Sequence, residues 1–242
     1  MSNTDPIKLA WDEVGSHLYE TGVDHCVLFV SNGTAYNDGI PWNGIIGVTE
    51  KASGADSNAL YADNVKYLNL LSAEEYGLTI QAYTYPDEFD ACNGLASPIA
   101  GMRATVGQQS RVPFAIAYRT KVGNDTMGEA YGYKYHIVYG CQASPSEKTH
   151  NTTSESPEAS EMSWEVTTTP VRFTYNNKEY TTSNIDIEVN ADTPSETKTK
   201  IMGVLDGIFG QDTSQATSDE EPVCRAILPT PDAIFTALGA TS

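Results

Sequence analysis

Apolar and polar positions alternate in several short segments of the chain, and this pattern predicts β-strands. Residues 113–122 alternate with Phe114, Ile116 and Tyr118 on one face, and residues 133–141 alternate again after a turn at 123–128. Two alternating runs around a glycine-containing turn predict a β-hairpin. Further strands are expected in short apolar runs between turn residues, at 26–30, 35–48 (interrupted by a turn at 37–39), 65–71, 78–85, 162–169, 171–175 and 185–189.

One main helix is predicted over residues 194–209. Its apolar residues have the spacing of a helix face that docks on a sheet: Ile201, Val204, Leu205, Ile208 and Phe209. Thr193 is the expected N-cap, because Pro194 follows it and Glu196 completes a capping box. A second short helical segment is expected at 230–238.

Polar stretches without periodicity are expected to be loops. The stretch 49–64 (TEKASGADSNALYADN) is the candidate functional loop, since long loops in compact domains are often functional. Residues 93–110 and 143–160 are also expected to be loops. Residues 1–20 are expected to form an N-terminal arm and residues 211–242 a C-terminal extension. The pattern predicts one mainly-β α+β domain over residues 1–242, with one packed helix, long loops and extended termini.

Composition and charge disfavour some classes of function. The 242 residues are 40% apolar and carry a formal net charge of −18, from 14 basic and 32 acidic side chains. This balance disfavours sequence-specific DNA binding and binding to anionic membranes. The charge is −11 over residues 1–100, +3 over 101–140 and −10 over 141–242. A basic segment between two acidic ones is compatible with solvated faces and also with a surface that meets a copy of itself.

The ends of the chain and its cysteines exclude other classes. The first ten residues are polar, unlike a secretory signal peptide, and no apolar run is long enough to span a membrane. Cys26, Cys92, Cys141 and Cys224 are scattered, without a CxxC pair or zinc-ligand spacing. We therefore expect buried free thiols and not a disulfide framework or a zinc site.

A search for catalytic and metal-binding motifs predicts no site. His136 lies within a predicted strand and is expected on the sheet surface. The remaining candidates are the carboxylate pairs Glu74–Glu75 and Asp87–Glu88 and the calcium-type ligands Asn124, Asp125 and Glu129. Adjacent carboxylates in turns of an acidic protein are usually solvated, and the spacing is not that of an EF-hand. No catalytic residue, cofactor or metal is predicted.

The order of several short motifs carries a family resemblance. The motifs are Trp42-Asn43-Gly44, Val48-Thr49-Glu50, residues 59–64, residues 78–89, Gly107-Gln108-Gln109, residues 118–121, Gly123-Asn124-Asp125, Tyr139-Gly140, residues 145–148, residues 156–159, Ser163-Trp164-Glu165 and Thr168-Thr169-Pro170. From about residue 10 to the C-terminus, the chain resembles the major tail proteins (tail tube proteins) of long-tailed siphophages of Gram-positive hosts. Residues 211–225 depart from the family pattern, so an elaboration is expected there.

The resemblance implies a β-sandwich or half-barrel of the tail tube type and a structural role without enzyme activity. It implies hexameric rings that stack into a hollow tube around a tape-measure protein, with tail terminator and baseplate proteins at the ends. Double-stranded DNA would pass through the lumen without specific binding. The protein would belong to the virion tail, after assembly in the host cytoplasm.

Head-to-tail rings need two complementary faces on each subunit. The candidate subunit interface consists of the basic residues Arg111, Arg119, Lys121 and Lys134, facing acidic groups of the first hundred residues. The candidate ring-stacking loop contributes Glu50, Lys51, Asp56, Tyr61 and Asp63. An electronegative lumen is expected, because cationic contacts would hold DNA. The alternative function is a secreted or cell-surface β-sandwich binding module of the lectin-like kind, and an acid-rich enzyme is a third reading.

Overall fold

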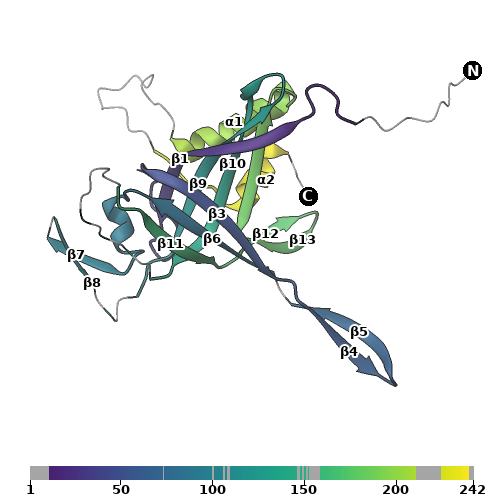
Figure 1. Cartoon of the computed structure of the whole chain (residues 1–242), viewed down its shortest axis with the longest axis horizontal. Helices are drawn as coiled ribbons and strands as arrows, with labels where there is room; N and C mark the ends of the chain where they lie inside the picture. Colours follow the sequence, from purple (N-terminus) through teal and green to yellow (C-terminus); the bar gives the residue numbers. More distant parts are fainter. Residues whose placement is uncertain are drawn as a thin grey trace, which may run out of the picture.

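The computed structural model describes residues 11–239 apart from 73, 100, 106, 108–109, 146–147, 149, 151, 153–158 and 211–224. β-strands dominate these residues (Figure 1). The strands are β1 (Leu18–Val30), β2 (Ile40–Trp42), β3 (Ile45–Gly54), β4 (Ser57–Ala62), β5 (Val65–Leu71), β6 (Glu74–Ala82), β7 (Leu95–Ile99), β8 (Met102–Thr105), β9 (Phe114–Asn124), β10 (Gly128–Ala143), β11 (Met162–Thr168), β12 (Val171–Tyr175), β13 (Lys178–Thr182) and β14 (Asn184–Asn190). The helices are η1 (Asp87–Asp90), α1 (Ser195–Phe209) and α2 (Pro231–Leu238).

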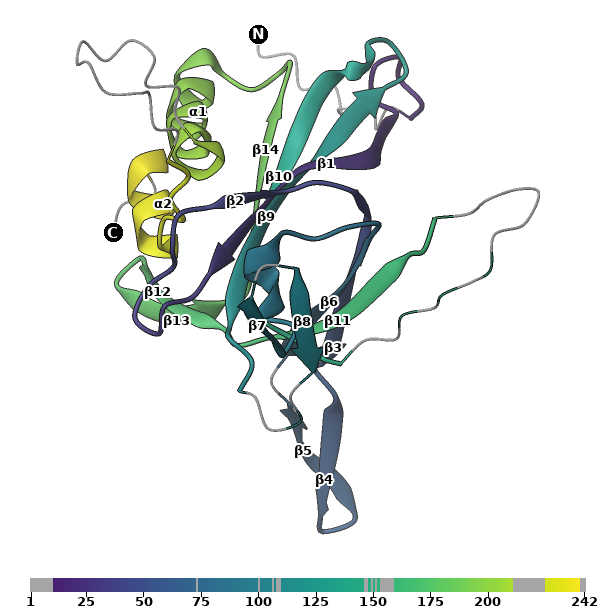
Figure 2. The same cartoon turned by 90° about the vertical axis from the view of Figure 1, so that its left-hand side faces the viewer.

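The main sheet is antiparallel and divides into two layers at β10. Its strand order is β2-β1-β9-β10-β11-β6-β3, with β14 also paired to β10. Residues 132–138 of β10 pair with β14, whereas residues 141–143 pair with β11. The register shifts between these parts, where Gly140 has φ 61°. Such an irregularity bends a strand, so β10 carries the chain from one layer to the other (Figure 2).

Two hydrophobic cores cover both faces of the β9–β10 layer. The first lies between the layers and includes Phe114, Ile116 and Tyr118 of β9 against Ile80 and Trp164. The second lies between β9–β10 and the helices, and it includes Ala115, Ile137, Leu205, Ile208 and Ile234. The alternation predicted for β9 and β10 is confirmed, because each set of alternating residues lies in a different core.

The sheet curls into a half-barrel with an open seam. β3 lies against the first half of β1, but the strand order gives these two strands no shared ladder. A cavity of 400 Å³ lies at the seam, lined by residues of β1, β3 and β9. The predicted fold class, a mainly-β α+β protein with a half-barrel, is confirmed.

Two expected loops are strands. Residues 49–64 belong to the end of β3, to β4 and to the turn before β5, so the loop prediction was wrong. The turn residues Asp63 and Asn64 have φ of 51° and 64°, as in a type I′ hairpin turn. Residues 93–110 were also predicted as a loop, yet they contain the hairpin β7–β8. The strand at 65–71 was predicted and is β5. β4 and β8 show no alternation of buried and exposed residues, because most of their side chains are exposed.

The helix and the chain ends also differ from expectation. α1 starts at Ser195 after Pro194, and no side chain caps it. The predicted capping box is absent because the Thr193 hydroxyl is hydrogen-bonded within a turn. It accepts from the backbone N–H of Asn190 and donates to the side-chain Oδ1 of Asn190. The arm ends before Leu18, where β1 begins. Residues 1–10, 211–224 and 240–242 of the predicted extensions lie outside the described residues.

The described end of the chain is part of the core and not an extension. α2 buries Ile234, and the Thr230 side chain caps its first turn by accepting from the Ala233 N–H. The ring of Phe235 stacks on Phe173 of β12 with centroids 4.9 Å apart. The Tyr139 hydroxyl donates to the Pro229 carbonyl at 2.9 Å. The second helical segment predicted at 230–238 is therefore confirmed, and it closes one face of the sheet.

Candidate assembly surfaces

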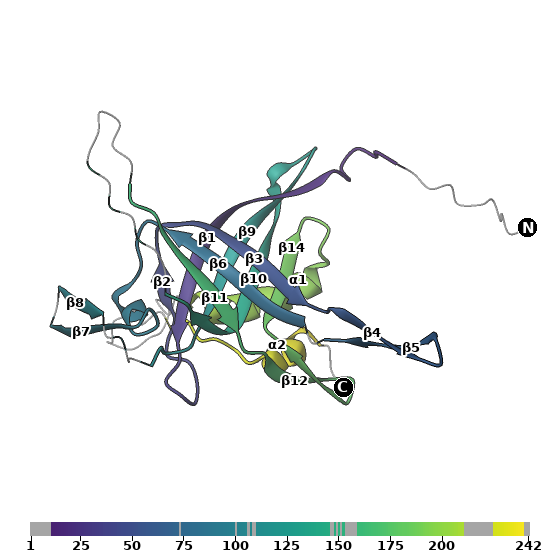
Figure 3. The same cartoon turned by 60° about the horizontal axis from the view of Figure 1, so that its bottom comes forward.

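The most exposed apolar surface of the protein is the hairpin β4–β5. It reaches away from the body of the molecule (Figures 1 and 3). Every residue of β5 is exposed, and so are Leu60 and Tyr61 of β4. Tyr61, Tyr67 and Leu71 are each exposed by 70% or more. An isolated two-stranded hairpin is at best marginally stable in water, and exposed apolar patches of this kind are typical of contact sites.

The predicted ring-stacking residues fall into two groups. Asp56, Tyr61 and Asp63 lie on the hairpin or at its root and tip. Glu50 and Lys51 lie instead on the part of β3 that pairs with β6. Glu50 accepts a hydrogen bond from the Tyr118 hydroxyl inside the half-barrel, and Lys51 pairs with Glu165 of β11 at 3.0 Å.

The predicted basic interface is mostly neutralised within the subunit. Arg119 forms a two-pronged pair with Asp24, through Nε at 2.7 Å and Nη2 at 2.8 Å. Lys121 pairs with Glu129 at 2.7 Å, and Lys134 with Glu20 at 3.4 Å. The hydrogen bond to Asp24 and the nearby negative charge raise the pKa of Arg119, although its partial burial opposes this.

Arg111 differs from the other three basic residues. Its Nη1 donates to the backbone carbonyl of Ala143 at 2.9 Å, and among the described residues no carboxylate pairs with it. The structure thus keeps three of the four cations in intramolecular pairs with acidic groups. Interface use of the four remains a prediction, and Arg111 is the one that has no ion pair with a described residue.

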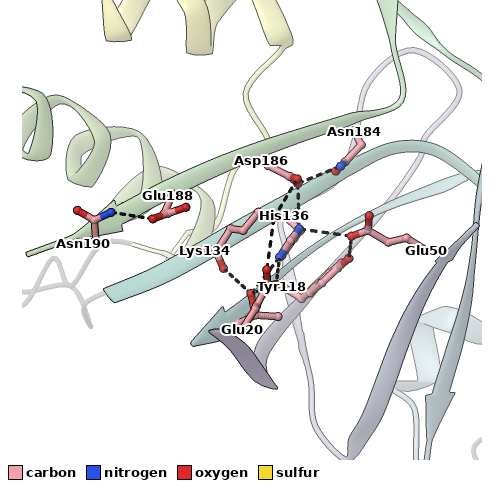
Figure 4. A network of polar contacts seen from close by, with 10 residues as sticks. Glu20, Glu50, Tyr118, Lys134, His136, Asn184, Asp186, Glu188 and Asn190 are labelled. Atoms are coloured by element: carbon pink, nitrogen blue, oxygen red, sulfur yellow. Dashed lines mark hydrogen bonds and ion pairs between the residues drawn. The ribbon is translucent and has the colours of Figure 1, made fainter. Parts of the chain in front are cut away.

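A buried polar network surrounds His136 inside the half-barrel (Figure 4). The His136 side chain is buried, at 3% exposure, so its predicted place on the sheet surface was wrong. Its Nδ1 lies 2.9 Å from Asp186 and 3.4 Å from Glu50, and its Nε2 lies 3.3 Å from Glu20. The Tyr118 ring stacks on the imidazole with centroids 4.6 Å apart.

The network joins strands that share no ladder. Glu20 comes from β1 and Glu50 from β3, the two sides of the seam, and both reach His136 of β10. Burial raises the pKa of Glu20, whereas the Thr120 hydrogen bond and the charges of Lys134 and His136 lower it. The lowering effects together exceed the effect of burial, so the pKa of Glu20 lies below its ordinary value. Burial and the bond to Glu50 raise the pKa of Tyr118, which keeps its hydroxyl a donor. The network thus links β1 and β3 across the open seam through His136.

The outer face of the β3–β6–β11 layer is polar. Its residues point away from the core because they alternate with buried ones: Thr49, Thr79, Gln81, Ser163, Glu165 and Thr167. The charge of Glu165 on this face is balanced by Lys51. Among these residues, the strand face is polar and carries no unpaired cation.

The residues searched for catalysis and metals have other partners. Asn124 caps a turn by accepting from the Met127 N–H at 2.6 Å, Asp125 accepts from the Gly15 N–H, and Glu129 pairs with Lys121. Asp87 pairs with Arg103. In the part of the chain that the structure describes, no group of His, Cys, Asp and Glu side chains has a metal-binding arrangement, and no helix is long and apolar enough to cross a membrane.

The described cysteines are buried free thiols. Burial raises the pKa of Cys26 and of Cys92 to about 12, and it raises the pKa of Cys141 as well. Thiols with raised pKa are poor nucleophiles and metal ligands. The expectation of buried free thiols is confirmed for these three, and Cys224 lies outside the described residues.

Sequence reasoning predicted β5 at 65–71, but it missed β4, and with it the apolar hairpin, and it missed the His136 network. The hairpin had a signal, since Asp63-Asn64 is a turn dipeptide between Tyr61 and Val65. The network had none, because its carboxylates come from β1, β3 and β14, far apart in the sequence.

The chain matches no family model and no curated protein. Three solved cryo-EM assemblies contain chains with some likeness. One is the extended sheath–tube complex of an extracellular contractile injection system, PVC, with TM-score 0.31, 14% identity, and coverage of 68% of this chain and 89% of that chain. The second is the six-fold symmetrised baseplate of the anti-feeding prophage (AFP), with TM-score 0.35, 9% identity and coverage of 74% and 97%. The third is the AFP tube-terminating cap, with TM-score 0.28, 12% identity and coverage of 76% and 99%. At these scores, no residue role or assembly is transferred from these chains to this one.

Proposed function

We propose that this protein is a structural subunit that assembles with copies of itself through the hairpin β4–β5, as a tail tube protein does. The exposed apolar side chains of this hairpin carry the proposal, because a two-stranded hairpin with Tyr61, Tyr67 and Leu71 in water needs a partner to be stable. The motif order that resembles siphophage major tail proteins supports the same role.

The finer features of the proposal follow that resemblance. Subunits form hexameric rings that stack into the hollow tail tube of a virion, around a tape-measure protein. Tail terminator and baseplate proteins bind the two ends, and assembly takes place in the host cytoplasm. The role is structural and includes no catalysis. A head-to-tail ring closes when the rotation between neighbours divides a full turn.

The outer face of β3–β6–β11 is the proposed lining of the lumen. It is polar, and Lys51 on it is neutralised by Glu165. Double-stranded DNA passing along such a surface gains little from counterion release, so it does not stick during ejection. The net charge of −18 adds repulsion over the distance at which charges remain unscreened.

The first test replaces the hairpin. The register pairs Ser53 with Glu75, so residues 55–73 can be exchanged for Asn-Gly, a two-residue turn that closes β3 and β6 directly. Negative-stain microscopy of the full chain is expected to show rings or tubes. The hairpin-replacement variant is expected to remain monomeric with an unchanged circular dichroism melting profile.

A point variant separates loss of contact from loss of fold. Tyr61→Ser with Tyr67→Ser changes only exposed side chains, so we expect unfolding free energy within about 0.5 kcal/mol of the parent. Thr181→Ser on β13 serves as the matched exposed-strand control. A parent protein that stays monomeric at high concentration, or a hairpin-replacement variant that still forms normal tubes, contradicts the proposal.

A further inference from the structure

A cavity of 360 Å³ is lined by residues of β7, β8 and β11 and of the segments beside them. Its apolar walls include Tyr85, Met162 and Trp164 of the first core. Three cations also line it, Arg103, Arg111 and Lys148. Ligand sites combine apolar walls with a few polar groups in this way. Three of the 14 basic residues in a strongly acidic chain thus converge on one hollow.

Two of these cations have no carboxylate partner among the residues that the structure describes. Arg103 is neutralised by Asp87 and Asp90. Arg111 binds only the Ala143 carbonyl, and neither Arg111 nor Lys148 forms an ion pair with any described residue. Two cations in one cavity without acidic partners among the described residues favour an anionic ligand there.

The Arg111 side chain is held in place. Gly94 has φ 74°, and a Cβ at this position would lie 3.4 Å from the guanidinium carbon, so the backbone lies against the guanidinium group. The Val112 N–H donates to the Ala91 carbonyl at 3.2 Å, which fixes the Arg111 backbone beside η1. The remaining N–H groups of a fixed guanidinium fork match a carboxylate in a two-pronged geometry.

We propose that this cavity binds a carboxylate-rich peptide segment, Asp219-Glu220-Glu221 of a second copy of the chain. This is the only run of three consecutive acidic residues in the sequence, and its charge complements Arg111 and Lys148. The inference deepens the proposed self-assembly and rests on it. It also gives Arg111, of the four predicted interface cations, a contact that the other three cannot make.

A second copy is the donor because of where the segment is attached. Gly210 ends α1, and Ala226 belongs to the second core, on the helix side of the sheet. The cavity walls Trp164 and Met162 belong to the first core, on the opposite side. The fourteen residues 211–224 can extend roughly 23 Å outward and return, at about 3.3 Å per residue. That reach is enough to meet a neighbouring subunit.

The direct test uses a peptide. A capped peptide of residues 217–222 (TSDEEP) is expected to bind the full chain in isothermal titration calorimetry, and the neutral peptide TSNQQP is not. Arg111→Gln is expected to weaken binding about tenfold, since it removes one charge-assisted contact. The control Arg172→Gln, whose exposed partner Glu179 lies on β13, is expected to leave binding unchanged. Equal binding of both peptides, or no effect of Arg111→Gln, overturns the proposal.

A charge swap tests the contact in the assembly. Arg111→Glu is expected to reduce tube formation, and Arg111→Glu with Glu220→Arg is expected to restore it. Melting profiles of both variants show whether the fold is kept. If both variants form tubes as the parent does, the cavity proposal is overturned and the proposed function stays intact. Peptide binding by a chain that never assembles overturns the proposed function instead.

Discussion

At the level of single residues, most cations of the central basic segment are paired with carboxylates of the same subunit. Arg119 and Lys134 hold acidic groups of β1, and His136 is enclosed by carboxylates from three strands. The sequence identified a basic segment between acidic ones, but it could not show that the segment's partners lie in its own chain. Pairing across 95 or more positions, as between Asp24 and Arg119, leaves no local trace in the sequence.

The His136 network predicts a loss of stability in acid. The pKa of Glu20 lies below its ordinary 4.5 and that of Asp186 below 3.8 in the folded protein, since hydrogen bonds and positive charge outweigh burial. A carboxyl whose folded pKa is lowered stabilises the fold above its unfolded pKa, and this stabilisation is lost as pH falls through the folded pKa. We therefore expect the unfolding free energy in urea to fall from about pH 5 downward.

The variant Glu20→Gln tests whether the carboxyls of the His136 network cause this pH dependence. It removes the titrating carboxyl, so the variant's unfolding free energy is expected to depend less on pH between about 5 and 3. The difference is expected to be below about 1 kcal/mol, because the Glu20 side chain is 40% exposed and solvent screens it. Glu13→Gln, in the exposed arm, is the control. The same pH dependence in parent and Glu20→Gln would show that the network does not titrate as described.

At the level of elements, periodicity predicted the strands whose two faces meet different surroundings. β11 buries alternate residues, whereas alternate residues of β9 and β10 lie in two different cores. The bounds of β9 and β11 were predicted to within two residues, and 133–141 of β10 was predicted. β5 was predicted at its bounds, 65–71, but its partner β4 was predicted as a loop, because neither face of β4 is buried and no period of two appears in it. The start of α1 was also misplaced, since Thr193 had an equally good local partner in Asn190.

Gly140 is expected to be the most sensitive backbone position of β10. Its φ is 61°, and a Cβ there would lie 2.1 Å from the Thr169 carbonyl oxygen. Gly140→Ala is expected to lower the unfolding free energy by about 3 kcal/mol or more, from strain and a backbone clash together. Gly33→Ala isolates the strain, because Gly33 has φ 95° and open space around it. If Gly140→Ala and Gly33→Ala lower the unfolding free energy equally, the clash with Thr169 does not contribute to the loss.

At the level of the whole molecule, the composition and pattern predicted a mainly-β protein with a packed helix, and the structure has both. They could not predict that one sheet would fold into two layers, because that depends on how β10 shares its partners between β14 and β11. Nor could they show that residues 225–239 belong to the core, since a polar stretch separates these residues from α1 in the sequence.

The C-terminal helix is expected to contribute to global stability. Ile234 is 1% exposed in the second core, so Ile234→Ala is expected to cost about 2–5 kcal/mol in chemical denaturation. Thr236→Ala, on the exposed side of α2, is expected to change the unfolding free energy by less than about 0.5 kcal/mol. A small effect of Ile234→Ala would mean that α2 is dispensable, as an extension would be.

The continuity of β3 has a mechanical consequence. This strand runs without a break from Ile45 in the half-barrel to Gly54 at the root of the hairpin, and it is paired with β6 along that length. A pull on the hairpin along β3 therefore acts parallel to the strands, and the ladder bonds, which lie across that direction, share the load in shear. A protein loaded in this way resists tension far better than one whose bonds open one after another, so a contact at the hairpin can transmit force into the body of the subunit.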